Sequence, residues 1–344
     1  MPQMICSFAT AAWILVVSSG LICRTLRSDT VVEVKIPVLR SVAFVDETHG
    51  WITGIGGIFH TKDGGKTWVR QSGEMPEADV SDLKMLDLGY LAWASQRRAI
   101  VLNELGWTSV DTLTGEQKEN RVGASLPVRF DAVALSDERH GWGITSAGEI
   151  YRTGDGGKSW QVLGKGMLEN VNSLFLKSRS EIWIGGSGSI YHSRDNGKSW
   201  VSTELDEDGA NRIQIECIRF FKGRLGWACG SAGIAFKSDD GGRSWSKKDL
   251  PRTRHPFFRG VSFFNESTGW IVGSSEDDDG EAKGVALCTT DGGVHWEVRN
   301  YPSREILTDV QALDDGKAWV VGADGTVFTT SDCGKSWTMQ KLVP

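Results

Sequence analysis

The stretch that decides the fold is Thr61-Lys62-Asp63-Gly64-Gly65-Lys66-Thr67-Trp68, because close copies of it recur down the chain. The copies follow the pattern Ser/Thr-x-Asp-x-Gly-x-Ser/Thr-Trp or nearly so, and they occupy residues 153–160, 193–200, 238–245, 289–296 and 330–337. Asp followed two residues later by Gly is typical of a tight hairpin loop, because the carboxylate accepts backbone N–H hydrogen bonds while Gly adopts a positive φ. We therefore expect each copy, an Asp-box, to close a β-hairpin whose next strand begins at the Trp.

A second series of tryptophans precedes the first, usually after Gly or Ala. Its members are Trp51, Trp93, Trp142, Trp183, Trp227, Trp270 and Trp319. Successive members lie 41–49 residues apart, which is the period of a four-stranded propeller blade rather than of a helical repeat. With the box tryptophans and Trp107, this series accounts for all but one of the 15 tryptophans, so nearly every Trp marks a repeat.

The order of elements inside a repeat predicts an all-β fold. An apolar alternating strand is followed by a polar loop, a Gly-Trp strand, a Gly-rich turn, a third strand that ends in the Asp-box, and a fourth strand that begins at the box Trp. This order predicts a seven-bladed β-propeller with four antiparallel strands per blade, over residues 31–344. The expected blades are about 41–72, 80–112, 131–164, 172–204, 216–250, 259–300 and 308–342. The Asp-box loops and the loops between first and second strands should share one face.

The N-terminal segment predicts export. Residues 4–23 carry no charge and have an apolar centre, so residues 1–30 are interpreted as a signal peptide or an N-terminal signal anchor. The expected location is periplasmic, lumenal or extracellular, with membrane association through this segment. The formal net charge of −6 argues against a nucleic-acid-binding surface.

Two repeats depart from the pattern. Repeat two keeps Trp93 and Trp107 but has no box Asp, which fits a structural rather than a chemical role for the box. Repeat six carries an acidic insertion at residues 274–281. An EF-hand would need an acidic ligand at position twelve, where Ala286 stands, and flanking helices, so a solvated loop is favoured over a calcium site.

The repeats also explain the residues that could carry chemistry. The box aspartates are interpreted as fold residues, because whole blades separate them and they cannot form a carboxylate pair. They are Asp63, Asp155, Asp195, Asp240, Asp291 and Asp332. No catalytic residue, metal site or cofactor is predicted. Cys217 and Cys229 are symmetric about Gly223 and should face each other across a hairpin, either as a cross-strand disulfide or as buried free thiols.

Residues 41–337 resemble the Asp-box (BNR-like) propellers of the photosystem II assembly and stability factor family. The resemblance rests on Gly50-Trp51-Ile52-Thr53-Gly54 and on the box that ends at Trp68. It implies an exported, non-catalytic scaffold that holds a membrane-protein subunit or its tail during assembly; we expect a monomer. The alternative is a glycoside hydrolase or sialidase-like Asp-box enzyme, which would need an arginine triad and a tyrosine nucleophile; no Phe/Tyr-Arg-Ile-Pro motif occurs.

A partner-binding face is expected opposite the Asp-boxes. The loops between blades are rich in arginine, and a polar residue stands eleven positions before each second-series Trp. These ring residues are Arg40, Asp82, Asp131, Asn172, Glu216, Arg259 and Thr308. We predict that Arg40, Arg252, Arg254 and Arg259 capture a carboxylate-bearing peptide tail by bidentate hydrogen bonds, the alternative being a merely solvated rim.

Overall fold

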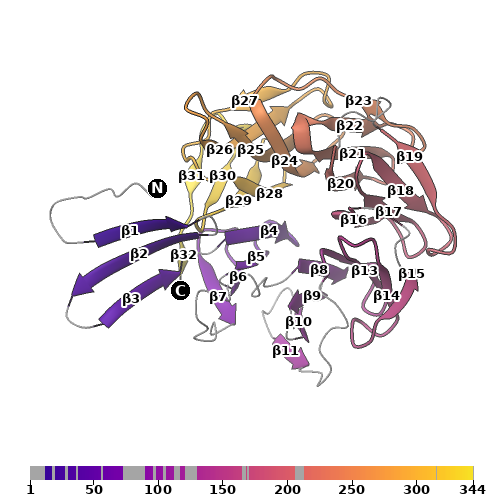
Figure 1. Ribbon diagram of the computed structural model, residues 1–344, viewed down its shortest axis with the longest axis horizontal. Coiled ribbons are helices and arrows are strands. Elements are labelled where there is room, and N and C mark those ends of the chain that lie inside the picture. Colours follow the sequence, from indigo (N-terminus) through magenta and orange to yellow (C-terminus); the bar gives the residue numbers. More distant parts are fainter. Residues whose placement is uncertain are drawn as a thin grey trace.

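The computed structural model of the chain describes residues 38–55, 57–72, 130–164, 168, 170–205, 213–314 and 316–343. It also describes the backbone of the strands at 12–17, 20–27, 30–35, 90–95, 98–103, 106–111 and 117–120. In Figure 1 the sheets from residue 38 onwards stand side by side around a common centre, in the order of the sequence, and the sheet of the first three strands lies to one side.

Six of the sheets have four antiparallel strands, paired in sequence order. The first is β8 (Tyr90–Ser95), β9 (Arg98–Asn103), β10 (Gly106–Asp111) and β11 (Gln117–Asn120). The second is β12 (Ala132–Leu135), β13 (Gly141–Ile144), β14 (Ile150–Thr153) and β15 (Gln161–Gly164), and the third is β16 (Ser173–Leu176), β17 (Ile182–Gly185), β18 (Ser189–Ser193) and β19 (Val201–Glu204). The fourth is β20 (Ile215–Phe221), β21 (Leu225–Gly230), β22 (Ala235–Ser238) and β23 (Ser246–Lys247). The last two are β24 (Arg254–Phe263), β25 (Gly269–Glu276), β26 (Ala282–Thr289) and β27 (Glu297–Arg299), then β28 (Leu307–Ala312), β29 (Ala318–Gly322), β30 (Val327–Thr330) and β31 (Thr338–Met339).

The remaining sheet of the ring has five strands. It contains β4 (Val38–Phe44), β5 (Gly50–Ile55), β6 (Gly57–Thr61), β7 (Trp68–Ser72) and β32 (Leu342–Val343). β32 pairs in parallel with β7, so the C-terminal strand joins the outer edge of the N-terminal sheet. The structure therefore shows six four-stranded blades and not seven, because the end of the chain adds a fifth strand to this sheet.

The sheet of β8–β11 covers residues 90–120, within and just beyond the predicted second blade of residues 80–112, with Trp93 on β8 and Trp107 on β10. Residues 80–89 of that predicted blade lie outside the described residues. In the other repeats an Asp-box fixes the hairpin and with it the register of the strands, and this repeat has no box.

The predicted export segment remains a prediction. Residues 1–11 lie outside the described residues. The backbone that follows forms an antiparallel sheet of β1 (Ala12–Val17), β2 (Gly20–Arg27) and β3 (Thr30–Lys35). No helix in the described part of the chain is long and apolar enough to cross a membrane.

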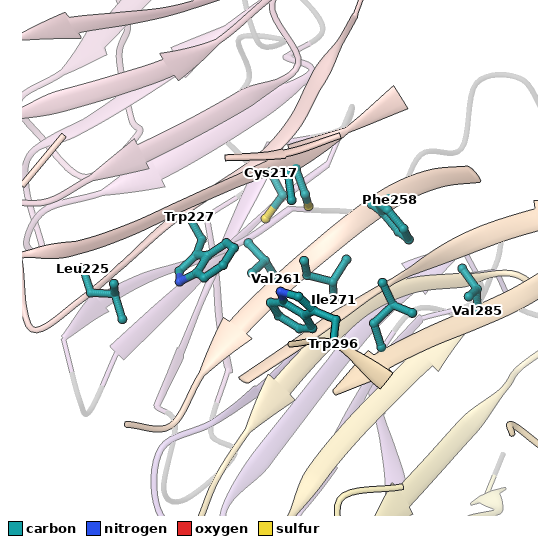
Figure 2. Packing of buried hydrophobic residues seen from close by; sticks show 11 residues of the cluster. Cys217, Leu225, Trp227, Phe258, Val261, Ile271, Val285 and Trp296 are labelled. Carbon is teal, nitrogen blue, oxygen red and sulfur yellow. The ribbon is translucent and has the colours of Figure 1, made fainter. Parts of the chain in front are cut away.

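Tryptophans pack between neighbouring sheets. Each described second-series Trp is at most 1 % exposed, and five of them meet the box Trp of the next sheet edge to face. The paired residues are Trp142 with Trp200, Trp183 with Trp245, Trp227 with Trp296, Trp270 with Trp337, and Trp319 with Trp68. Figure 2 shows one such pair, Trp227 and Trp296, packed with Val261 and Ile271.

The Asp-box hairpins have the predicted geometry. In the first box the Asp63 carboxylate accepts hydrogen bonds from the Thr67 N–H (2.9 Å), the Thr67 hydroxyl (2.6 Å) and the Thr61 hydroxyl (2.7 Å). The Gly65 N–H donates to the Thr61 hydroxyl oxygen (2.8 Å), and Gly65 has φ +84°. The other five boxes repeat these contacts, and in one of them His295 takes the place of the Ser or Thr hydroxyl on Asp291.

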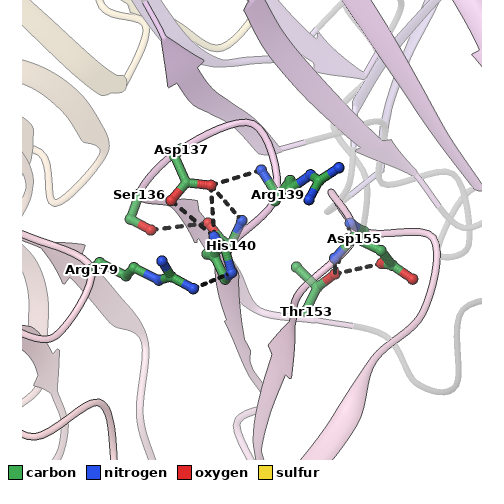
Figure 3. A network of polar contacts seen from close by, with 8 residues as sticks. Ser136, Asp137, Arg139, His140, Thr153, Asp155 and Arg179 are labelled. Atoms are coloured by element: carbon green, nitrogen blue, oxygen red, sulfur yellow. Dashed lines mark hydrogen bonds and ion pairs between the residues drawn. The ribbon is translucent and has the colours of Figure 1, made fainter.

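The box loops share a face with the loops between first and second strands, as predicted. In five boxes the residue after the Asp is Gly or Cys, and its N–H reaches a carbonyl of that neighbouring loop, as in Gly64 N–H to Thr48 O (2.9 Å). The same face carries polar links between sheets: in Figure 3 Asp137 contacts His140, and Arg179 of the next sheet reaches the other nitrogen of that ring. This face is therefore closed by backbone and side-chain hydrogen bonds.

Candidate protein-binding face

The face opposite the Asp-boxes is built from the turns between second and third strands and from the loops between sheets. The Gly188 N–H donates to Ile213 O (2.7 Å), and the Ala323 N–H donates to Ile306 O (3.0 Å). The first bond joins the turn between β17 and β18 to the loop that leads into β20 of the next sheet. The second joins the turn between β29 and β30 to the loop that leads into β28 of the same sheet. The predicted arrangement of this face is confirmed.

Four predicted ring residues lie at β-bulges of innermost strands. The register of each strand with its partner shifts at the ring residue, which is Arg40 on β4, Glu216 on β20, Arg259 on β24 or Thr308 on β28; β24 has a second shift, between Arg254 and Phe257. A bulge bends the strand and redirects a side chain, and bulges are frequent beside functional sites. The polar ring is thus tied to a repeated backbone irregularity.

Three ring residues interact across neighbouring sheets. The Asn172 amide donates to Glu216 Oε1 (3.1 Å), and Arg259 acts on Glu216 electrostatically. Burial raises the pKa of Glu216, while the Asn172 amide and the Arg259 charge oppose the rise. The three residues come from the sheets of β16–β19, β20–β23 and β24–β27, so the ring spans these sheets.

Arg259 is held in place by its own sheet. The guanidinium carbon lies 4.4 Å from the centre of the Phe257 ring, and Nη1 donates to the Ser274 hydroxyl oxygen (2.8 Å). Burial lowers the pKa of Arg259, and the charge of Glu216 opposes the shift. A guanidinium keeps its positive charge in proteins. A positioned, half-buried guanidinium of this kind suits recognition of a carboxylate.

Arg254 contacts the acidic insertion. Its Nη1 donates to Asp277 O (3.3 Å) and Asp278 O (3.1 Å), and Arg304 forms an ion pair with the Asp277 side chain. The insertion is therefore not simply a solvated loop: residues 274–276 extend β25, and β26 runs antiparallel to them. The sequence missed this because β-pairing depends on the partner strand as much as on local composition.

The four predicted arginines come from two regions. Arg252 is exposed just before β24, where Arg254 is also exposed, and Arg259 is half-buried further along the same strand. Arg40 is exposed on β4, and the sheet of β28–β31 separates it from the other three.

Two charged residues of the innermost strands were not predicted. Asp309 on β28 accepts hydrogen bonds from the Ser41 hydroxyl and the Val42 N–H, both at 3.1 Å, and so joins its sheet to β4. Burial raises the pKa of Asp309, and the positive charge of Arg219 on β20 opposes the rise. Asp309 follows a ring residue and Arg219 lies three positions after one, so scanning the whole innermost strand would have found them.

A pocket of about 490 Å³ opens on the other face, beside an Asp-box. Its lining includes Lys177, Glu181, Arg194, Arg224, Asp240 and Arg243. Lys177 is paired with Glu181 (3.2 Å), and Asp240 is engaged in its own box. These contacts hold the carboxylates in structural roles.

Two tyrosines in the described part of the chain have raised pKa values. Burial raises the pKa of Tyr301 to about 12, and burial with the neighbouring Glu149 raises that of Tyr151. Both phenols stay protonated, whereas a tyrosine nucleophile needs the opposite shift. In the described part of the chain, no group of three or more His, Cys, Asp or Glu residues could hold a metal ion.

Antiparallel sheets around a centre, closed by an Asp-box in every described repeat except that of β8–β11, define a β-propeller of the BNR type. The family described as Photosynthesis system II assembly factor YCF48 matches residues 26–172, 114–213 and 261–344. These matches cover more than half of the chain, which therefore belongs to that family. The resemblance drawn from the sequence is confirmed.

Individual relatives are more distant. The chain is similar to the photosystem II assembly lipoprotein Ycf48 of Prochlorococcus marinus, at 26% identity over 121 residues. That alignment covers 35% of this chain and 34% of the relative, so it spans about a third of the relative's length. A solved structure of YCF48 bound to a D1 peptide has a TM-score of 0.64 at 17% identity, over 86% of this chain and 92% of that one. The GH74 enzyme of Niastella koreensis has a TM-score of 0.65 at 14% identity, over 88% of this chain and 53% of that one. Both structures share the fold.

Proposed function

We propose that this chain is a non-catalytic scaffold that binds a carboxylate-bearing segment of a membrane-protein subunit during assembly of a complex such as photosystem II. Membership of the YCF48 family supports the role, and a YCF48 structure with a bound D1 peptide supports the kind of partner. The observation that carries the proposal is the set of polar residues at the β-bulges of the innermost strands. Among them, the guanidinium of Arg259 is fixed 4.4 Å from the centre of the Phe257 side chain, and Arg40 is exposed.

The arginines suit a peptide tail for a physical reason. Two parallel N–H···O bonds from a guanidinium match a carboxylate, and a group already fixed by stacking loses little entropy on binding. Arg259 supplies such a fixed group, and exposed Arg252 and Arg254 add positive charge at the start of the same strand. Arg40 would meet a more distant part of the segment.

Peptide binding tests the proposal. We expect a fluorescent D1 peptide with a free C-terminal carboxylate to bind the full-length chain, and the amidated peptide to bind about 10- to 100-fold more weakly, since a charge-assisted hydrogen bond contributes about 1.5–3 kcal/mol. The variant with Arg40, Arg252, Arg254 and Arg259 changed to Ala should show a similar loss while its circular dichroism and unfolding curve stay unchanged.

The matched control removes arginines from the Asp-box face. Arg194→Ala with Arg243→Ala removes charge from the pocket on that face, and we expect binding to be unaffected. Equal binding of the free and amidated peptides would contradict the carboxylate proposal, since that comparison needs no variant. Loss of binding in this control alone would show that the partner binds the Asp-box face and not the face opposite it.

We also propose that the protein has no enzyme activity. The raised pKa values of Tyr151 and Tyr301 and the structural contacts of the box aspartates support this over a glycoside hydrolase. Turnover of aryl glycosides that disappears in Glu216→Gln, which removes a partly buried carboxylate of the ring, would contradict it.

Three further features belong to the proposal. The five-stranded sheet would act as a seventh blade that closes the ring, and its core packing with Trp319, Val321 and Val327 of the sheet of β28–β31 supports this. The chain would be an exported monomer, held at a membrane through residues 1–30 or through its partner; the lipoprotein name of a Ycf48 relative supports this location. Fractionation that finds the full-length chain in the cytosol would contradict the location.

A further inference from the structure

Cys333 has an unusual backbone conformation for its residue type. It follows the box Asp332, a position that holds Gly in four of the other boxes and Asn in the fifth. Its φ is +56°, in the left-handed region. A Cβ is disfavoured in that region, and a residue held there against its preference points to a function.

The neighbour of Cys333 is a second cysteine from the adjacent sheet. Cys333 is half-buried and packs against the core cluster that contains Cys288 of β26, which is 1 % exposed. The Cys333 thiol adds to the rise in the pKa of Cys288 that burial causes. Cys333 belongs to the β30–β31 hairpin, so this contact crosses from one sheet to the next.

The other two cysteines outside the predicted export segment lie opposite each other on neighbouring strands. Cys217 on β20 and Cys229 on β21 are Cα partners in register, as the symmetry about Gly223 predicts. Both are buried, and Figure 2 shows Cys217 among the side chains between β20–β23 and β24–β27. All four cysteines are free thiols in this structure, so the bridge left open by the sequence is not formed here.

We propose that Cys288 and Cys333 form a disulfide that links the sheet of β24–β27 to the sheet of β28–β31. The reaction needs an oxidant that itself contains a disulfide, such as glutathione disulfide or a disulfide-bonded thiol carrier. The two thiols lose their protons, one S–S bond forms, and the two electrons reduce the disulfide of the oxidant to two thiols.

The order of the steps follows from exposure. Cys333 is the accessible thiol, and its thiolate attacks the oxidant to form a mixed disulfide. Burial raises the pKa of Cys288 to about 12, so Cys288 reacts second and displaces the oxidant's thiol as it loses its proton.

The two cysteine pairs should differ in effect. Cys217 and Cys229 lie on strands that already pair, so a bond between them encloses a short hairpin. A bond between Cys288 and Cys333 encloses a much longer stretch of chain and couples two sheets that otherwise meet through side chains. A cross-link that encloses a longer loop restricts the unfolded chain more.

Peptide mapping tests the bond directly. The full-length chain is equilibrated with glutathione at a series of reduced-to-oxidised ratios, alkylated, and digested with trypsin. We expect the peptide of residues 284–299 linked to that of residues 318–335 to appear as the buffer becomes oxidising. Absence of this linked peptide at every ratio, or pairing of Cys288 or Cys333 with Cys217 or Cys229, would overturn the proposal.

Cys333→Gly adds a second test, in which the expected change in Tm differs between reducing and oxidising buffer. The change restores the residue of four other boxes, so in reducing buffer we expect the Tm to stay unchanged or rise. In oxidising buffer the same change removes the cross-link, and the Tm should fall by about 5–10 °C. Cys217→Ala is the control, and its effect should not reverse in this way. An equal effect of Cys333→Gly in both buffers would mean that Cys333 has no partner.

Discussion

Gly242 should be among the positions where replacing glycine by alanine lowers the free energy of unfolding the most. It is the second Gly of its Asp-box, with φ +87°, and a Cβ built on it would lie 2.2 Å from Cη2, 2.6 Å from Cζ2 and 2.8 Å from Cζ3 of Trp183. Trp183 is fully buried between two sheets and cannot move aside easily. We expect Gly242→Ala to lose about 1–2 kcal/mol from the left-handed backbone and about 1–3 kcal/mol from overpacking, or about 2–5 kcal/mol in all.

Two other glycines separate these contributions. Gly280 has φ +82° but no atom within 4 Å of the place that a Cβ would take, so Gly280→Ala should lose only the backbone part, about 1–2 kcal/mol. Gly154 has neither a positive φ nor a neighbour within 4 Å, so Gly154→Ala should change stability by less than about 0.5 kcal/mol. Urea unfolding followed by tryptophan fluorescence gives the three values. If Gly242→Ala costs no more than Gly280→Ala, the contact between box glycine and Trp183 does not stabilise the join between sheets.

Three more outcomes are expected. Asp240→Ala removes the hydrogen bonds from Ser244 N–H, the Ser244 hydroxyl and the Ser238 hydroxyl, and it should cost about 1–3 kcal/mol in the same urea assay; no loss would show that the box carboxylate is dispensable. The Ser199 hydroxyl and N–H hold the pKa of Asp195 at about 2, below its unfolded value of 3.8. The stability that this box contributes should therefore be complete above about pH 4 and decline towards pH 2. An unfolding midpoint that stays constant over that range would contradict this. Burial lowers the pKa of His192 from 6.5 to about 4, so folding favours the neutral ring. Stability should therefore fall as the pH drops from 6.5 towards 4. His192→Gln should remove this decline, and an NMR titration of the imidazole should match it.

The local architecture could be predicted from the sequence because its determinants lie close together in the chain. The Asp-box is stabilised by hydrogen bonds between residues two and four apart, as between Thr61 and Asp63 or Gly65, so the pattern of eight residues contains the whole hairpin. The same holds for the shared face of the box loops. The ring residues were also found by spacing, since Arg259 and Glu216 stand at one fixed distance before their tryptophans and both lie at a bulge.

Where a local determinant is missing, the tertiary structure decided. Repeat two has no box, so pairing with neighbouring strands, and not an Asp-box hairpin, sets the register of its described strands β8–β11. The extension of β25 and β26 depends in the same way on the pairing of two strands and on Arg254, which lies outside both.

The sequence by itself determined the repeat, the strand order and the position of each box, because hydrogen bonds and hydrophobic alternation act over a few residues. Only the tertiary structure decided that β32 returns to pair with β7, that Asp309 joins β28 to β4, and that Cys333 packs against the cluster that contains Cys288. These contacts join residues from different repeats, as between Asp309 and Val42, 267 positions apart. Their geometry depends on the curvature accumulated over all the sheets between them, and no short pattern of residues encodes that sum.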